Sequence, residues 1–269
     1  RIRMRSPAGL IHSSALSHLD SCGFTVITRF LSPDTARLLR DDACACERLS
    51  RAARVGNPAA GTHQMATAVR TSRMTPLIPP PPTCVGSIDI RTDFCDSVRS
   101  LCEDLNRAHL EFLPSPLERF QTELAYLYYE RGGFYRRHVD VPTERGGWTR
   151  RGRRDEDGGS FSGFEMRRAV SFLVYLNEGW KSTDGGALRI YGSRENEQER
   201  HVDVQPEAGT LVMFRSDTVA HEVLTTHRRR QCIVGWFLIT RERRRSGSHG
   251  SMDQIGQPTA RGLGTKARV

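Results

Sequence analysis

Hydrophobic and polar residues alternate in short stretches through the second half of the chain, from about residue 120 to residue 240. Successive side chains of a strand point to opposite faces, so a period of two predicts strands with one face buried. Turn residues separate these stretches. The predicted strands are residues 123–129, 135–139, 169–176, 187–191, 202–204, 210–214 and 232–239.

The N-terminal part of the chain has a different pattern. Residues 22–31 alternate like a strand, and the Ser-Pro-Asp sequence at 32–34 is typical of a helix start, with serine as N-cap and proline in the first turn. A second helix is predicted around residues 94–108, where apolar residues recur every three or four positions. Between the helices, a loop from about 55 to 83 ends in four prolines, which exclude helix and central strand.

Helices followed by many short strands favour a mainly β fold with supporting helices. Residues 1–15 are expected to form a flexible segment, 16–118 a support region of helices and a strand, 119–240 the β core, and 241–269 a disordered basic tail. Within the core, residues 143–168 are rich in Gly, Arg and Asp, which predicts a mobile insertion.

The formal net charge of +9 is concentrated at the two ends of the chain. Three arginines fall within residues 1–10, and residues 241–269 have seven basic against two acidic side chains, so the rest is close to neutral. This distribution favours solvated tails over a nucleic-acid-binding groove. There is no run of about 18 apolar residues that would predict a membrane helix, and no apolar stretch typical of a secretory signal. We therefore expect neither a nucleic-acid partner nor a membrane.

The cysteines indicate a reducing compartment. There are seven of them, an odd number without a C-x-x-C pair, which argues against a disulfide framework. Reduced, buried thiols are the simplest interpretation. We expect a cytoplasmic monomer, with the nucleus as an alternative location.

The strongest chemical signal is the sequence His138-Val139-Asp140. On a strand, residues i and i+2 share a face, so the imidazole and the carboxylate can bind one ion together. His221, just before an apolar strand, is the best candidate for a third ligand. Two histidines and one carboxylate form the facial triad of non-haem iron(II) oxygenases, which leaves coordination positions open.

Arg230 lies nine residues after His221, at the start of the apolar stretch 231–237. In an apolar barrel, its planar guanidinium can bind a carboxylate. Tyr175 can donate its hydroxyl to the same carboxylate. Metal ligands together with a carboxylate receptor are what a bidentate 2-oxoacid cosubstrate requires.

Several stretches carry a family resemblance: YYERGGFYRRHVD (128–140), VYLNEGW (174–180), GGALRIY (185–191), FRSD (214–217) and HEV (221–223), then Arg230 and Trp236. With them, residues 120–240 resemble the catalytic core of the prolyl 4-hydroxylase-like Fe(II)/2-oxoglutarate-dependent dioxygenases, closest to the hypoxia-inducible-factor prolyl hydroxylase branch and its microbial relatives. The resemblance implies a double-stranded β-helix, a jelly-roll or cupin-like fold.

The resemblance also implies roles for individual residues. His138, Asp140 and His221 would bind Fe(2+), while Arg230 with Tyr175 would hold the distal carboxylate of 2-oxoglutarate.

Three further aromatic residues receive roles in the same way. Tyr128 would sit in the cosubstrate pocket, Trp236 would border the substrate proline, and Tyr135 would line the approach to the metal. The implied reaction is 4-hydroxylation of a prolyl residue in a protein or peptide partner, which consumes O2, releases succinate and CO2, and uses ascorbate as reductant. Oxygen sensing is an implied biological role.

Two features depart from this pattern. Collagen-type prolyl hydroxylases carry lysine in place of Arg230, and the segment between Asp140 and Tyr175 is longer than usual. In the family this segment closes over the peptide, so the substrate is least defined there. The alternatives are the same chemistry on a free amino acid, a natural product or another protein side chain, a non-catalytic cupin-like binding module, and a nucleic-acid demethylase.

Overall fold

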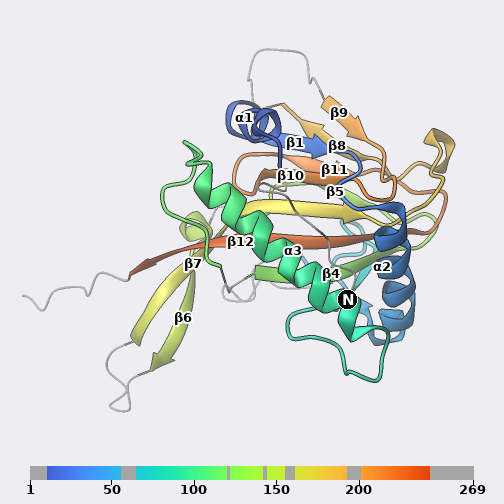
Figure 1. Cartoon of the computed structure of the whole chain (residues 1–269), viewed down its shortest axis with the longest axis horizontal. Helices are drawn as coiled ribbons and strands as arrows, with labels where there is room; N and C mark the ends of the chain where they lie inside the picture. Colours follow the sequence, from blue (N-terminus) through green and yellow to red (C-terminus); the bar gives the residue numbers. More distant parts are fainter. Residues whose placement is uncertain are drawn as a thin grey trace, which may run out of the picture.

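The computed structural model describes residues 11–55, 65–119, 122–141, 144–154, 161–192 and 201–242. Two antiparallel sheets face each other across an apolar interior, and helices cover the outer face of the larger sheet (Figure 1). This arrangement is the double-stranded β-helix with supporting helices that the sequence predicts.

The helices precede the core strands in the described part of the chain. They are α1 (Ser13–Cys22), α2 (Pro33–Cys46) and α3 (Ile88–Arg107), with short 3-10 turns at residues 47–49, 144–147 and 182–184. Ser32 caps α2 by accepting a hydrogen bond from the Thr35 amide, as the Ser-Pro-Asp sequence predicts. α1 corrects the expectation of a flexible segment up to residue 15, because the helix begins at Ser13 and the preceding Ile11 is buried.

The larger sheet has eight described strands, in the order β1-β10-β7-β12-β4-β3-β2, with β6 paired to β7. Both edges of the sheet come from the N-terminal region, so this region and the predicted β core share one sheet. The strands are β1 (Phe24–Ile27), β2 (Arg51–Ala52), β3 (Ser72–Pro76), β4 (Thr122–Tyr129), β6 (Thr149–Arg154), β7 (Phe161–Tyr175), β10 (Leu211–Arg215) and β12 (Arg230–Glu242).

The smaller sheet has four described strands, in the order β5-β11-β8-β9. Its strands lie in the upper part of Figure 1, close to β1 and β10 of the larger sheet. Its strands are β5 (Tyr135–His138), β8 (Leu188–Tyr191), β9 (His201–Val204) and β11 (His221–Val223).

The central strands of the larger sheet are buried on both faces. Along β4, Tyr126 and Tyr128 pack into the core beneath the helices, whereas Leu127 and Tyr129 belong to the interior between the sheets. The two faces alternate because neighbouring strand residues point in opposite directions.

Close packing within the larger sheet requires a glycine at one position. A Cβ built on Gly235 of β12 would lie 2.2 Å from Cζ of Phe172, so any side chain there would displace the Phe172 ring.

Two sequence predictions about loops are wrong. Residues 149–154 and 161–168, expected to belong to a mobile insertion, form the hairpin of β6 with the first half of β7, which projects from the sheet in Figure 1. The predicted loop 55–83 contains β3, which pairs with β4. Residues 155–160 and the predicted tail from 243 onward lie outside the described residues.

Within the described part, no helix has the length and apolar character needed to cross a membrane.

Candidate metal centre

Three side chains meet where β5 and β11 of the smaller sheet pair. His138 ends β5 and His221 begins β11, and the two residues are direct partners across the pair of strands. Asp140 follows His138 by two residues, and its Oδ1 lies 3.5 Å from Nε2 of His138 and 3.9 Å from Nε2 of His221. The candidate donor atoms of the three residues all lie within 4.8 Å of one another. The structure therefore brings together the three ligands predicted from the sequence.

Backbone carbonyls orient both imidazoles. Nδ1 of His138 lies 2.8 Å from the carbonyl oxygen of Arg136, and Nδ1 of His221 lies 3.1 Å from that of Val219. A neutral imidazole that donates from Nδ1 keeps its lone pair on Nε2, which is the atom turned toward Asp140. Burial lowers the pKa of His221 to about 4, and the neighbouring His138 acts in the same direction, so His221 is neutral at physiological pH.

The larger sheet holds the carboxylate of Asp140. Its Oδ2 accepts hydrogen bonds from Oγ of Ser171 at 2.6 Å and from Nε1 of Trp236 at 2.8 Å. Burial by itself raises the pKa of Asp140, but the adjacent His138 and His221 hold this pKa far below its usual value. Oδ1 is left facing the imidazoles as an anionic ligand.

This donor set fits iron(II). Two imidazoles and one carboxylate on one side of an ion match the 2-His-1-carboxylate arrangement of non-haem iron sites. All three side chains line a cavity of about 1210 Å³ between the sheets, which leaves room for further ligands on the open side.

Arg230 is a buried cation without a counter-charge. Its side chain is fully buried on the same face of β12 as Trp236, and Nε donates to the carbonyl oxygen of Gly186 at 2.9 Å. Nη2 has no hydrogen-bond partner, and among the described residues no carboxylate lies within ion-pair distance of the guanidinium. A buried, unpaired charge is costly unless a ligand compensates it, so this guanidinium is suited to a bound carboxylate.

Two tyrosines flank this guanidinium. The rings of Tyr175 and Tyr129 lie 5.1 and 5.0 Å from Cζ of Arg230. The Tyr175 hydroxyl is buried without a hydrogen-bond partner, and burial raises its pKa despite the nearby Arg230, so the hydroxyl stays protonated and can donate. Tyr129 also lines the cavity that contains the metal ligands, whereas Arg230 and Tyr175 lie behind this lining.

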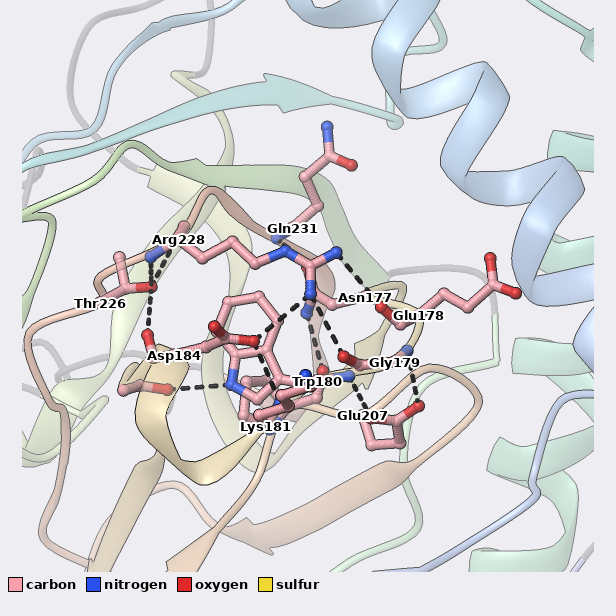
Figure 2. Close-up of polar contacts among 12 residues, drawn as sticks. Asn177, Glu178, Gly179, Trp180, Lys181, Asp184, Glu207, Thr226, Arg228 and Gln231 are labelled. Atoms are coloured by element: carbon pink, nitrogen blue, oxygen red, sulfur yellow. Dashed lines mark hydrogen bonds and ion pairs between the residues drawn. The ribbon is translucent and has the colours of Figure 1, made fainter.

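The loop after β7 is hydrogen-bonded to Arg228 and Gln231, which lie on either side of Arg230 in the sequence (Figure 2). Arg228 reaches across this loop to the carbonyl oxygens of Glu178 and Gly179 and to the carboxylate of Asp184, each at 3.3 Å. Asn177 accepts a hydrogen bond from the Gln231 amide at 2.7 Å. These contacts tie the loop to the residues on both sides of Arg230.

Gly186, at the end of this loop, allows the close approach of Arg230. Its φ is +67°, and a Cβ at this position would lie 3.1 Å from Cδ of Arg230. A glycine is therefore favoured here both by the backbone conformation and by the space.

The predicted cosubstrate residue on β4 is wrong by one position. Tyr128 points toward the helices and donates its hydroxyl to the carbonyl oxygen of Ala43 at 2.8 Å. Tyr129, the direct partner of Arg230 across the strand pair, faces the interior instead. A shift of one residue along a strand reverses the face.

The two other aromatic residues lie at the metal centre. Trp236 lines the cavity but also holds Asp140, a contact that no sequence signal indicated. Tyr135 stacks on the His138 imidazole, with ring centres 3.6 Å apart. Ser171 was missed as well, because serine in an apolar strand has no distinguishing pattern.

Comparisons with known proteins agree with this geometry. Residues 124–238 match the 2OG-Fe(II) oxygenase superfamily. A hypoxia-inducible factor prolyl hydroxylase of Caenorhabditis elegans is 30% identical over 126 residues, which are 46% of this chain and 14% of that protein. A prolyl 3-hydroxylase of Xenopus laevis is 33% identical over 76 residues, 26% of this chain and 15% of that protein. The matched segments thus span about one seventh of these relatives' length.

Solved structures share the fold over most of the chain. A Pseudomonas putida prolyl-4-hydroxylase has a TM-score of 0.58 at 27% identity, covering 86% of this chain and 98% of its own. A prolyl hydroxylase of Trichoplax adhaerens, solved with a hypoxia inducible factor peptide fragment, has a TM-score of 0.61 at 21% identity, covering 84% and 88%. The shared fold therefore extends beyond residues 124–238.

Proposed function

Because residues 124–238 form a 2OG-Fe(II) oxygenase domain, we propose that the chain hydroxylates a prolyl residue of a protein at C4, with release of succinate and CO2. One observation carries the proposal. The metal triad lines the cavity between the sheets, and the unpaired, buried guanidinium of Arg230 lies 5.0 Å from the ring of Tyr129, another residue of that lining. An iron ion and a dicarboxylate cosubstrate need these two elements together.

The metal, the cosubstrate and the protein side chains have different roles in the proposed reaction. Bound by His138, Asp140 and His221, iron(II) supplies the activation of O2 and the oxidation of a carbon–hydrogen bond. Arg230 binds and orients the far carboxylate of 2-oxoglutarate, which offsets the cost of its own buried charge. Tyr175 donates its otherwise unpartnered hydroxyl to that carboxylate.

Other residues fix the geometry of the site and exclude water from it. Ser171 and Trp236 fix one oxygen of Asp140, so the other oxygen stays directed at the metal position. The apolar side chains of Leu173, Leu188 and Val234 line the cavity and exclude water from the reacting groups.

The choice of proline as target rests on the relatives. Prolyl hydroxylases recur among the similar proteins and structures, and the Trichoplax enzyme was solved with a peptide bound. The cytoplasmic monomer and the ascorbate requirement also belong to this proposal. All seven cysteines are free thiols, which is compatible with a reducing compartment.

The test is mass spectrometry of proline-containing peptides after incubation with the protein, iron(II), 2-oxoglutarate and ascorbate. We expect a mass gain of one oxygen on proline, coupled to succinate release. His138→Ala should abolish both, whereas His109→Asn, an exposed control whose φ of 50° asparagine tolerates, should retain them. Oxygen on another residue, or only on a free amino acid, would refute the prolyl assignment but not the oxygenase chemistry. Metal binding without any turnover would favour the cupin-like binding module.

A further inference from the structure

The rim of the metal cavity carries positive charge without a counter-charge. Four arginines line the cavity, and one of them, Arg168, is paired with Glu123 through a 2.9 Å hydrogen bond. The other three, Arg51, Arg54 and Arg70, have no carboxylate within ion-pair distance among the described residues. The remaining carboxylate of the lining, Asp140, is a metal ligand.

Arg70 is the member of this group that approaches the metal. Its guanidinium carbon lies 4.5 Å from the centre of the Tyr135 ring, and that ring stacks at 3.6 Å on His138. Arg70 therefore faces the interior of the cavity beside a metal ligand.

Arg51 and Arg54 lie farther out and are exposed. Arg51 belongs to β2, the last strand of the larger sheet on this side. The three arginines therefore line the same cavity as the metal ligands.

Exposed apolar side chains accompany these arginines. Met65, Val69 and Ile78 also line the cavity, and they are 53%, 37% and 49% exposed. These three make up half of the large hydrophobic residues that are exposed in the described part. Apolar surface and unpaired cations gathered at one cavity mouth are typical of a binding surface.

We propose that this rim binds an acidic segment of the peptide substrate, with a carboxylate next to the target residue on Arg70 and further carboxylates on Arg51 and Arg54. This inference rests on the proposed peptide hydroxylation. Guanidinium and carboxylate groups form strong, directional pairs, and Met65, Val69 and Ile78 bury the apolar residues between the acidic ones. A nucleic acid is disfavoured because aliphatic side chains, not aromatic ones, accompany the arginines on the exposed rim.

The experiment compares three pools of synthetic peptides that share one central proline and differ only in their flanking residues, which are acidic, amide or basic. Binding to the full chain with iron(II) and 2-oxoglutarate is measured without O2 by fluorescence anisotropy, and hydroxylation is measured with O2. We expect the acidic pool to bind tightest, with an affinity that falls as salt increases. The double variant Arg51→Gln with Arg54→Gln should weaken acidic-pool binding by about threefold to tenfold. Arg70→Gln should weaken it further.

A matched control removes the same charge elsewhere. Arg29 and Arg131 are exposed, do not line the cavity and have no ion pair among the described residues, so Arg29→Gln with Arg131→Gln should leave binding unchanged. Equal binding of the three pools, or equal losses in the two double variants, would overturn the inference. So would an Arg70→Gln variant that raises KM for 2-oxoglutarate and not for the peptide, or displacement of the acidic pool by single-stranded RNA.

The anaerobic measurement separates this inference from the proposed function. If the acidic pool binds in an arginine-dependent way but no oxygen is transferred to proline, the role of the rim in binding acidic segments is supported and prolyl hydroxylation is refuted. Hydroxylation of all three pools with equal KM would support prolyl hydroxylation and refute the binding of acidic segments at the rim.

Discussion

Trp236 allows a sharp test of how the metal site is held. The sequence resemblance assigns it to the substrate proline, whereas the structure shows its indole N–H on Oδ2 of Asp140 at 2.8 Å. The substitution Trp236→Phe removes this donor and keeps an aromatic ring under the guanidinium of Arg168, which lies 3.8 Å from the ring centre.

The size of the effect follows from the contact. A hydrogen bond to a charged acceptor contributes about 1.5–3 kcal/mol, and Ser171 still holds the same oxygen in the variant. Loss of a residue that orients a metal ligand typically weakens metal binding by about 10- to 100-fold. We therefore expect Trp236→Phe to raise the Kd for iron(II) by about tenfold, and the double variant with Ser171→Ala to raise it well beyond either single change.

The assay is anaerobic titration of iron(II) into metal-free protein, followed by calorimetry, with KM for the peptide measured separately. Trp148→Phe is the control, because Trp148 has no contact with the metal ligands. An unchanged Kd for iron(II) in Trp236→Phe, together with a raised KM for the peptide, would refute the positioning role and restore the role in substrate binding.

Three further predictions concern the interior. Arg230→Met should raise the Tm of the ligand-free protein, because a buried unpaired charge is removed. The variant should also lose the increase in Tm that 2-oxoglutarate causes in a thermal shift assay. If 2-oxoglutarate still raised the Tm of the variant, Arg230 would not be the residue that binds its carboxylate. Tyr128→Phe should lower the free energy of unfolding by about 1 kcal/mol through loss of the bond to Ala43, with KM for 2-oxoglutarate unchanged, and a raised KM would reinstate Tyr128 in the pocket. The pKa of His221 is lower in the folded protein, about 4, than its ordinary value of 6.5, so the unfolded chain binds more protons between these values and the metal-free protein should lose stability as the pH falls through this window. Urea unfolding at two pH values checks this, and a His221→Phe variant with the same pH dependence would contradict it.

The chemistry of the site could be predicted where it depends on local spacing. His138 and Asp140 are two residues apart, so they are expected on the same face of a strand. His221 and Arg230 both come shortly before the same apolar stretch, residues 231–237. Tyr129 could not be distinguished from Tyr128, because β4 is buried on both faces and both positions are apolar. Its register against Arg230 depends on a pairing between distant segments.

β6 and the first half of β7 escaped prediction for a different reason, whereas the second half of β7 coincides with the strand predicted at 169–176. The hairpin projects from the sheet in Figure 1, and its sequence is rich in Gly and Arg without a regular alternation of apolar and polar residues. The contacts of Ser171 and Trp236 with Asp140 join the larger sheet to the end of β5 and were equally invisible in the sequence.

The strand pairing of the larger sheet determines which truncated forms of this protein can fold. The family match begins at residue 124, yet β3 pairs with β4 and β1 pairs with β10. A truncated protein limited to residues 124–238 would leave the backbone donors and acceptors of β4 and β10 unpaired along two open strand edges, which are templates for aggregation. It would also uncover the apolar face that α2 and α3 shield. The smallest unit suited to recombinant expression therefore starts before α1, more than one hundred residues ahead of the family boundary.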